Sequence, residues 1–411
     1  MPLTPEQVTV IKATVPVLQE YGNAITTAFY RNMLNAHPEL RTVFNMVNQT
    51  NGHQQRALAG AVFAYASHID DLGALGPAVE LICHKHASLY IQPEQYQIVG
   101  KFLLEAMAEV LGDALTPAIH DAWAAAYWQL ADIMIGREKQ LYDEADGWTD
   151  WRQFKVARKT PESAEITSFY LEPVDGKPLP AFQPGQYISV RVPVPELGYV
   201  QPRQYSLSDR PDPSYYRISV KKEAGLASGD KAHPGYVSNV LHGNVNEGDL
   251  VDVSHPYGDF FLSSSEAATP VVLLSAGVGL TPLTSMLNTI TAQGAPHPER
   301  KIHFIHGAHT TGARAFSRHI LGLNKQFPNL NATFFVSAPA ADDRQGVDYH
   351  HVGRINLQKL DLAGDLYLDN PETEYYVCGP TAFMTDMKTS LSAQGVADAR
   401  IKMELFGTGG I

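Results

Sequence analysis

The hydrophobic pattern of this chain changes twice, and these two changes constrain its fold more than any other feature. From residue 1 to about 145, apolar residues recur at spacings of three and four, as in amphipathic helices. From about 152 to 264, short, alternating, β-branched runs are separated by turn residues, which indicates a β-barrel or sandwich. From about 267 onward, continuous apolar runs alternate with helical segments, as in a parallel sheet covered on both faces. The sequence therefore predicts three domains, over residues 1–147, 152–264 and 267–411.

The same patterns predict where the main helices and strands lie. Pro5, between Thr4 and Glu6, is typical of a helix start, because proline loses nothing at the first helical position. We expect helices over residues 5–21, 23–35, 53–70, 74–90, 93–111 and 116–144. We expect strands over residues 155–158, 166–171, 187–192 and 216–220 in the second domain, and over 271–275, 301–305, 332–336 and 374–377 in the third.

Charge and cysteine content exclude several classes of protein. The formal net charge is −12 over 411 residues, whereas a nucleic-acid-binding chain normally carries a basic patch. Cys83 and Cys378 are the only cysteines, too few for a disulfide framework or for the four thiolates of an iron–sulfur cluster. No apolar stretch reaches the roughly 20 residues of a membrane span, and the first residues do not resemble a signal peptide. We therefore expect a cytoplasmic chain without nucleic-acid partners.

Two glycine motifs follow predicted strands of the third domain. In Ala276-Gly277-Val278-Gly279-Leu280-Thr281-Pro282, the glycines permit close approach of a pyrophosphate, which the N-terminus of the following helix favours electrostatically. The third glycine of the dinucleotide fingerprint is missing, so a turn that serves only helix–strand packing is the alternative. Cys378-Gly379-Pro380 follows a later strand, at the sheet edge where open α/β sheets bind ligands. An inert buried thiol is the alternative for Cys378.

A polar motif, Arg203-Gln204-Tyr205-Ser206, interrupts the strands of the second domain. The guanidinium of Arg203 suits a phosphate, the ring of Tyr205 suits a flat ring, and the hydroxyl of Ser206 suits a ring nitrogen. Taken alone, the motif is an ordinary polar strand end. Its companions are Pro184-Gly185-Gln186-Tyr187 upstream and Gly235-Tyr236-Val237-Ser238 downstream.

Two histidines, His84 and His86, precede a predicted corner between helices, and Pro93 suits the first turn of the helix after that corner. Residues two apart in a helix project about 200° apart, so only one of the two imidazoles can face a given pocket. We expect one histidine to be a ligand and the other to face solvent. The alternative is a pair of ordinary surface or core histidines.

The motifs of the second and third domains, in their order along residues 152–411, resemble those of the ferredoxin–NADP reductase superfamily. The resemblance implies an antiparallel FAD barrel followed by an NAD(P)-binding α/β domain. It implies that Arg203 contacts the FAD pyrophosphate, Tyr205 the flavin or ribityl chain, and Ser206 the region of flavin N5. The implied cofactor-binding residues are Tyr187, Arg203, Gln204, Tyr205, Ser206, Gly235, Tyr236, Val237, Ser238, Gly277, Val278, Gly279, Leu280, Thr281, Pro282, Cys378, Gly379, Pro380, Glu404, Leu405, Phe406 and Gly407.

A flavin reductase needs an electron acceptor, and the cysteine content excludes an iron–sulfur cluster, which leaves the helical domain as the candidate. That domain resembles a globin, and the whole chain resembles the flavohaemoglobins from end to end. The resemblance implies that His86 ligates the haem iron and that Tyr96 and Glu138 are its hydrogen-bond partners. It also implies that Phe44 wedges the haem, that Lys85 reaches a haem propionate or the flavin, and that Tyr30, Gln54 and Leu58 form the distal pocket. The alternatives are a solvated Lys85 and an ordinary, partly buried helix face for Tyr30 and Gln54.

The resemblance implies a nitric oxide dioxygenase with one haem b, one FAD and NAD(P)H as electron donor, whose substrates are NO and O₂ and whose role is NO detoxification. We expect a monomer, although no feature of the sequence determines the oligomeric state. Two other functions stay open: a haem-based O₂ or NO sensor or store that its reductase keeps ferrous, and a flavin reductase acting on quinones, hydroperoxides or lipids. The choice between NADH and NADPH also stays open. No acidic residue follows the strand that ends near His306, and Arg314 and Arg318 suit a 2′-phosphate, although the family generally uses NADH. The long segment 224–234 and the tail after Phe406 depart from the family pattern.

Overall fold

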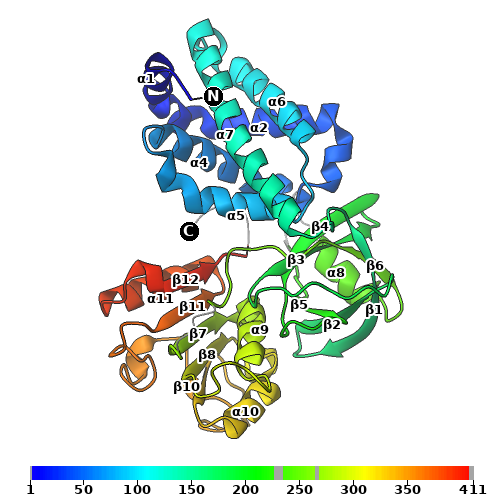
Figure 1. Ribbon diagram of the computed structural model, residues 1–411, viewed down its shortest axis with the longest axis vertical. Helices are drawn as coiled ribbons and strands as arrows, with labels where there is room; N and C mark the ends of the chain where they lie inside the picture. Colours follow the sequence, from blue (N-terminus) through cyan, green and yellow to red (C-terminus); the bar gives the residue numbers. More distant parts are fainter. Residues whose placement is uncertain (1, 226–234, 264–267, 407–411) are drawn as a thin grey trace.

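The computed structural model of the chain describes residues 2–225, 235–263 and 268–406, and Figure 1 shows three bodies. A helical domain, blue to cyan, lies above two sheet domains. The antiparallel domain, in green, holds β1 to β6, and the parallel domain, yellow to red, holds β7 to β12. The three-domain class predicted from the hydrophobic pattern is confirmed. The helical domain ends with α7 at Glu144, and the first strand begins at Arg152.

The helical domain consists of α1 (Pro5–Ala13), α2 (Val15–Ala36), α3 (Met46–Thr50), α4 (His53–Ser67), α5 (Gly76–Ala87), α6 (Pro93–Leu111) and α7 (Pro117–Glu144). Short 3₁₀ turns connect several of them, at Pro38–Thr42, Leu72–Leu75 and Gly112–Ala114. α2 packs against α4 and α6, while α5 and α1 pack against α7. Thr4 and Gln7 form a capping box at the start of α1, and Thr116 accepts a hydrogen bond from the Ile119 N–H at the start of α7.

The break expected near residue 22 was placed wrongly. The chain interrupts its helix at Thr14 instead, where the Thr14 hydroxyl and N–H both donate to the Ile11 carbonyl. Pro16, at the start of α2, has no N–H to continue the ladder of α1. Gly22 lies buried inside α2, where a Cβ atom would be 3.6 Å from the Cβ of Ala59 on α4. This glycine therefore serves the α2–α4 contact rather than a chain break.

The antiparallel domain is a six-stranded barrel in the order β4-β3-β6-β1-β2-β5. Its strands are β1 (Arg152–Pro161), β2 (Ile166–Pro173), β3 (Tyr187–Val194), β4 (Tyr199–Ser206), β5 (Tyr216–Lys221) and β6 (Leu250–Val253). An isolated bridge between Leu207 and Ile218 joins the ends of β4 and β5, which closes the sheet. α8 (Tyr236–Gly243) packs against β3, β4 and β5.

The parallel domain has strand order β10-β9-β8-β7-β11-β12. Its elements are β7 (Val271–Ala276), α9 (Leu280–Ile290), β8 (Ile302–Ala308), α10 (Ser317–Gln326), β9 (Leu330–Val336), β10 (His351–Val352), β11 (Glu374–Cys378), α11 (Thr381–Ala393) and β12 (Ile401–Glu404). Separate apolar clusters cover the two faces of the sheet. The strand order reverses between β7 and β11, and open α/β sheets bind ligands at the carboxyl ends of strands at such a point.

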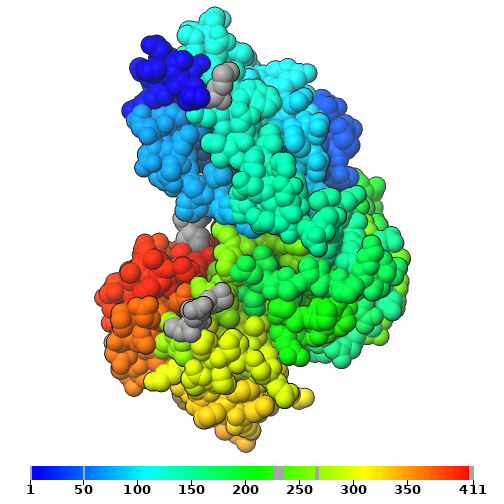
Figure 2. All heavy atoms as spheres, in the orientation of Figure 1, coloured from blue at the N-terminus to red at the C-terminus, as the bar shows by residue number. Residues whose placement is uncertain are grey.

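α5 is one of the segments through which the helical domain meets the barrel, and the turn Pro38–Thr42 with the start of α3, which hydrogen-bonds with Gln201 of β4, is another. Figure 1 shows it along the lower side of the helical domain, and Figure 2 shows atoms of the helical domain adjoining those of the barrel. Hydrogen bonds from Ser189 of β3 to Ser88, just after α5, hold this contact. Across the residues described, none of the helices has both the length and the apolar character needed to cross a membrane.

Candidate functional site

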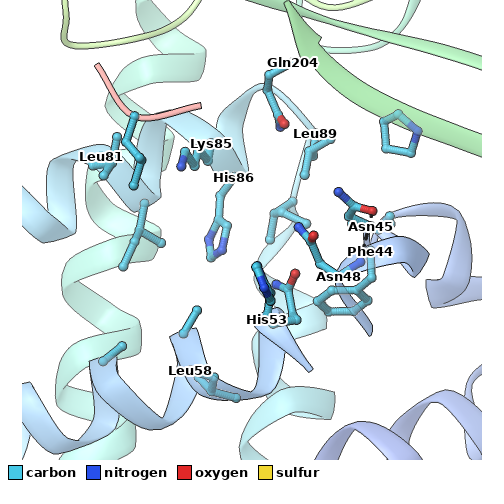
Figure 3. Close-up of a pocket in the computed structure, with 18 of the residues that line it drawn as sticks. Phe44, Asn45, Asn48, His53, Leu58, Leu81, Lys85, His86, Leu89 and Gln204 are labelled. Atoms are coloured by element: carbon cyan, nitrogen blue, oxygen red, sulfur yellow. Dashed lines mark hydrogen bonds between the residues drawn. The ribbon is translucent and has the colours of Figure 1, made fainter. Parts of the chain in front are cut away.

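A continuous cavity of about 1440 Å³ extends from the interior of the helical domain to the barrel. It is larger than the roughly 300–1,000 Å³ of a usual small-molecule site. Residues of α2, α4, α5, α6, α7 and β4 line it, together with the start of α8 and the chain end beyond β12. Figure 3 shows one part, where His86 points from α5 into the cavity toward Leu58 of α4, with Phe44 to one side. The cavity therefore joins the two halves of the predicted site.

His86 has two hydrogen-bond partners at its Nδ1 atom, Tyr96 and Glu138. Its Nδ1 lies 2.8 Å from Glu138 Oε1 and 3.0 Å from Tyr96 Oη, and the Tyr96 hydroxyl donates to Glu138 Oε1 at 2.5 Å. An ionised carboxylate only accepts hydrogen bonds, so the proton of the neutral imidazole resides on Nδ1. The lone pair is then on Nε2, the nitrogen that can ligate a metal in the cavity. An imidazole whose Nδ1–H is held in this way is suited to ligate a haem iron through Nε2.

Local sequence explains how Tyr96 and Glu138 reach His86. Pro93 and a capping box between Gln92 and Gln95 start α6, which places Tyr96 in its first turn. The Tyr127 hydroxyl of α7 donates to the Tyr96 carbonyl at 2.5 Å. Glu138 is only 2% exposed and Tyr96 only 7%. Burial, and next the Glu138 charge, raise the pKa of Tyr96 well above its usual range, so this phenol stays protonated and donates.

The predicted distal residues line the same cavity. Tyr30 is 5% exposed and hydrogen-bonded with Gln54, and burial raises its pKa above the usual range. The ring of Phe44 meets the ring of Tyr30 edge-on, with centroids 5.6 Å apart. Leu58 lies one helical turn after Gln54 on α4, so both face inward. Asn45, Asn48 and His53 also line this cavity, and no motif in the sequence marked them.

The expectation that the second histidine faces solvent was wrong. His84 is only 7% exposed, because the face of α5 opposite His86 is covered by the barrel. The Gly258 N–H donates to His84 Nδ1 at 3.0 Å, and His84 Nε2 lies 3.1 Å from Glu80 Oε1. Helix geometry predicts that His84 and His86 point in opposite directions. It does not predict the burial of His84, because Gly258 of the barrel, which covers this histidine, lies 174 residues further along the chain.

The barrel contributes its predicted residues to the other end of the cavity. Arg203, Gln204, Tyr205 and Ser206 belong to β4, and Ser206 pairs with Tyr187 across the ladder with β3. Arg203 Nη1 donates to the Pro202 carbonyl at 2.6 Å, and burial lowers the pKa of Arg203 to about 10. The guanidinium is thus a partly buried cation beside a large cavity, a donor suited to a phosphate. Gly235, Tyr236, Val237 and Ser238 line the same region.

The structure brings the two glycine motifs of the α/β domain into contact. A Cβ atom on Gly279 would lie 2.2 Å from the Cys378 carbonyl oxygen, so only glycine allows this approach. Gly277 has φ of +58°, a conformation that glycine adopts without strain. Leu280, Thr281 and Pro282 begin α9, Gly379 and Pro380 precede α11, and Val278 and Thr281 line the large cavity. Burial raises the pKa of Cys378, so its thiol stays protonated.

Lys85 and Glu404 approach the cavity from the helical and α/β domains respectively. Burial, and next the charge of Asp259, raise the pKa of Glu404 to about 8, while the Lys85 ammonium opposes that rise. Burial lowers the pKa of Lys85, against the attraction of Glu404. Leu405 and Phe406 line the cavity beside them, and Gly407 lies outside the described residues. Lys85 is therefore not the solvated lysine of the alternative interpretation.

Comparison with known proteins agrees with this architecture. The globin family model matches residues 27–134, and the model of an oxidoreductase NAD-binding domain matches residues 273–389. A flavohemoprotein of Bordetella parapertussis is 53% identical over 414 aligned positions, covering 100% of each chain. The crystal structure of the Malassezia yamatoensis flavohemoglobin with bound FAD and heme superposes with a TM-score of 0.83 at 31% identity, covering 98% of this chain and 100% of that one.

A second solved structure matches the two sheet domains alone. It is the FAD/NAD-binding domain of a nitric oxide dioxygenase from Vibrio cholerae, at 36% identity and a TM-score of 0.55, covering 63% of this chain and 99% of that one. The fold and the site thus define an oxidoreductase in which a globin domain is joined to an NAD-binding reductase module. More closely, the chain belongs to the flavohemoprotein family.

Proposed function

We propose that this protein is an NAD(P)H-dependent nitric oxide dioxygenase, which converts NO and O₂ to nitrate and so removes NO. One observation carries the proposal: the His86 imidazole, with its Nδ1–H directed to Glu138 and Tyr96, faces a cavity that continues to the polar residues of β4. Such a geometry suits a proximal haem ligand of raised basicity, within reach of an electron source.

The cavity has space and donors for two cofactors, one haem b and one FAD. We assign His86 Nε2 as the haem ligand and Phe44 and Leu58 as apolar contacts of the ring. Arg203 is suited to bind the FAD pyrophosphate. The flavin ring system is assigned to Tyr187, Tyr205 and Ser206. The nicotinamide donor fits the junction of the two glycine motifs, beside Val278 and Thr281. When bound, FAD converts the two-electron donor into single electrons, and haem iron activates O₂.

The residues of this chain have distinct roles in the proposed reaction. Glu138 and Tyr96 hold the proton on His86 Nδ1 and thereby keep Nε2 directed at the cavity. Tyr30 and Gln54 place hydrogen-bond donors on the distal side, where negative charge develops on the oxygen atoms of the substrate. Since Tyr30 is buried, its donor is preorganised, and hydrogen bonds to charge are stronger in a protein interior than in water.

We infer that NADH is the better donor. Of the two arginines that the sequence offered to a 2′-phosphate, Arg314 is buried, with its guanidinium 4.7 Å from the centroid of Phe334. Arg318 is exposed at the start of α10. A 2′-phosphate would therefore meet one of these cations rather than two, which weakens the case for NADPH.

The stoichiometry of nitrate formation tests this function. Conversion of one NO and one O₂ to nitrate needs one electron, and NADH supplies two. We therefore expect two nitrates per NADH in a steady state with NO and O₂. A sensor or store would consume NADH without matching nitrate, and a flavin reductase without haem would show no Soret band. Either result would reject the proposed function.

A further inference from the structure

The imidazole of His84 connects the helix that carries His86 to the barrel. The Gly258 N–H donates to His84 Nδ1 at 3.0 Å, with both groups buried. Because Nδ1 accepts this bond, the neutral ring carries its proton on Nε2, which donates to Glu80 Oε1 at 3.1 Å. The two nitrogens of one ring thus hold two different partners, one from the barrel and one from α5.

Both ends of this connection lie next to residues of the proposed site. Glu80 is fixed by Arg137 through Nε at 2.8 Å and Nη2 at 2.6 Å, and Arg137 directly precedes Glu138 in α7. On the barrel side, Gly258 follows Tyr257, which pairs with the cavity-lining Tyr187. A Cβ atom on Gly258 would lie 3.0 Å from the Tyr187 ring, so the Gly258 amide is packed directly against that tyrosine.

Two more hydrogen bonds from the barrel hold the chain just after His86. Ser189 Oγ of β3 donates to Ser88 Oγ at 2.9 Å, and Ser88 Oγ donates to the Lys85 carbonyl at 2.8 Å. The His255 N–H donates to Tyr90 Oη at 3.0 Å, and Tyr90 has φ of +55°, a costly conformation for a residue with a side chain. His86 therefore lies between anchors to the barrel on both sides in sequence.

We propose that His84 is a positioning residue for electron transfer from the flavin site to the haem site, because its imidazole fixes the His86-bearing turn of α5 against the strands that carry Tyr187. The inference rests on the proposed function. His84 contacts neither reacting group, so it acts on the placement of His86 relative to the barrel. Placement matters for this step, because electron transfer slows as the separation of the donor and the acceptor increases, and a site of this kind depends on the contacts that hold its residues in position.

Two amide substitutions separate the two bonds of this imidazole. The side-chain oxygen of His84→Asn falls near the position of Nδ1 and keeps an acceptor for the Gly258 N–H. The side-chain nitrogen of His84→Gln falls near Nε2 and keeps a donor for Glu80, but the acceptor for Gly258 is lost. Both variants are polar and uncharged, so they form a matched pair.

The full chain loaded with haem and FAD is mixed rapidly with NADH without oxygen, and flavin and haem reduction are followed separately. Flavin reduction should be unchanged in both variants. Haem reduction should stay near the wild-type rate in His84→Asn and slow severalfold in His84→Gln. Hydrogen exchange of the Gly258 amide, in the same protein, should accelerate in His84→Gln alone.

The outcomes are distinguishable. The role of His84 is overturned if the wild type and His84→Gln reduce their haem at the same rate. It is also overturned if haem reduction slows by the same factor in His84→Asn and His84→Gln. Slowed flavin reduction in His84→Gln also overturns it, because the defect is then not specific to the transfer step. If the wild type itself does not reduce its haem, the proposed function fails, and this inference fails with it.

Discussion

Glu138, with its buried carboxylate, is the residue on which the proposed proximal side of the haem depends. It accepts hydrogen bonds from both His86 and Tyr96 while being 2% exposed. Glu138→Gln keeps the shape of the side chain but removes the charge that orients the His86 Nδ1–H. We expect nitrate formation to fall by about 10- to 100-fold, as for other partners of metal ligands, and the iron–histidine stretching frequency to decrease.

Asp143→Asn is the matched control, because Asp143 belongs to the same helix and its side chain is 66% exposed. It should leave both the rate and the iron–histidine frequency unchanged. An unaltered frequency in Glu138→Gln would show that this carboxylate does not tune His86.

Tyr30 is the corresponding residue on the proposed distal side. Tyr30→Phe keeps the ring that packs against Phe29 and Phe44 and removes only the hydroxyl. A hydrogen bond to a charged group contributes about 1.5–3 kcal/mol, so dioxygen should dissociate roughly ten- to a hundredfold faster. Flash photolysis gives this rate, flavin reduction by NADH should be unaffected, and Tyr21→Phe on the exposed side of α2 is the control. An unchanged dissociation rate in Tyr30→Phe would count against the assigned pocket.

At the scale of residues, helix geometry alone could establish that His84 and His86 point apart. It could not select His86, because Tyr96 and Glu138 are 10 and 52 residues away in sequence. The choice came from resemblance to a family. The burial of His84 was not predictable, because it depends on how the barrel docks rather than on any pattern near residue 84.

At the scale of elements, the close contact of two turns organises the proposed nicotinamide site. A Cβ atom on Gly279 would lie 2.2 Å from the Cys378 carbonyl oxygen and 2.6 Å from the Gly379 nitrogen, and these neighbours are backbone atoms that cannot easily move. Gly279→Ala should therefore separate α9 from the end of β11, destabilise the domain by about 1–3 kcal/mol and raise the KM for NADH.

Gly312→Ala is the control, because a Cβ atom there meets nothing within 4 Å. It should leave both the KM for NADH and the thermal midpoint at their wild-type values. A normal KM in Gly279→Ala would remove the nicotinamide donor from this junction.

Hydrophobic period predicted most elements within a few residues, because buried faces repeat with the period of the helix or strand. It failed at the first helix break, where Gly22 resembled a breaker but serves close packing against Ala59. Thr14 caps the end of α1. Pro16, which has no N–H to continue the ladder of α1, lies in the first turn of α2. Such tertiary uses of glycine are invisible in one sequence.

At the scale of the whole molecule, a buried histidine links stability to pH. His306 of β8 is 1% exposed, its Nδ1 lies 2.9 Å from Ser275 Oγ, and burial followed by the Arg314 charge lowers its pKa to about 3. The unfolded chain takes up this proton below about pH 6.5, whereas the folded chain takes it up only near pH 3. The stability due to neutral His306 is therefore complete above pH 6.5 and is lost as the pH falls from 6.5 toward 3.

His306→Asn removes this titration and keeps a polar partner for Ser275. From pH 7 to pH 5, the variant should lose about 2 kcal/mol less free energy of unfolding than the wild type. Urea unfolding at the two pH values measures the difference, and His309→Asn, at an exposed position, should behave as the wild type. An equal loss in wild type and His306→Asn would contradict the assigned titration.

The three-domain order was predictable because each domain has its own hydrophobic period, but the docking of the helical domain was not. Its contacts with the barrel join residues more than 100 positions apart, such as Ser88 with Ser189. These contacts make one cavity out of two half-sites, and on that cavity the proposed function rests.

The most direct test of the central claim is nitrate formation by His86→Ala, measured together with flavin reduction by NADH in the same preparation. If His86 holds the haem at which nitrate is made, and the reductase module works independently, the variant should reduce its flavin at the wild-type rate and form no nitrate. Nitrate formation at the wild-type rate in His86→Ala would contradict the account.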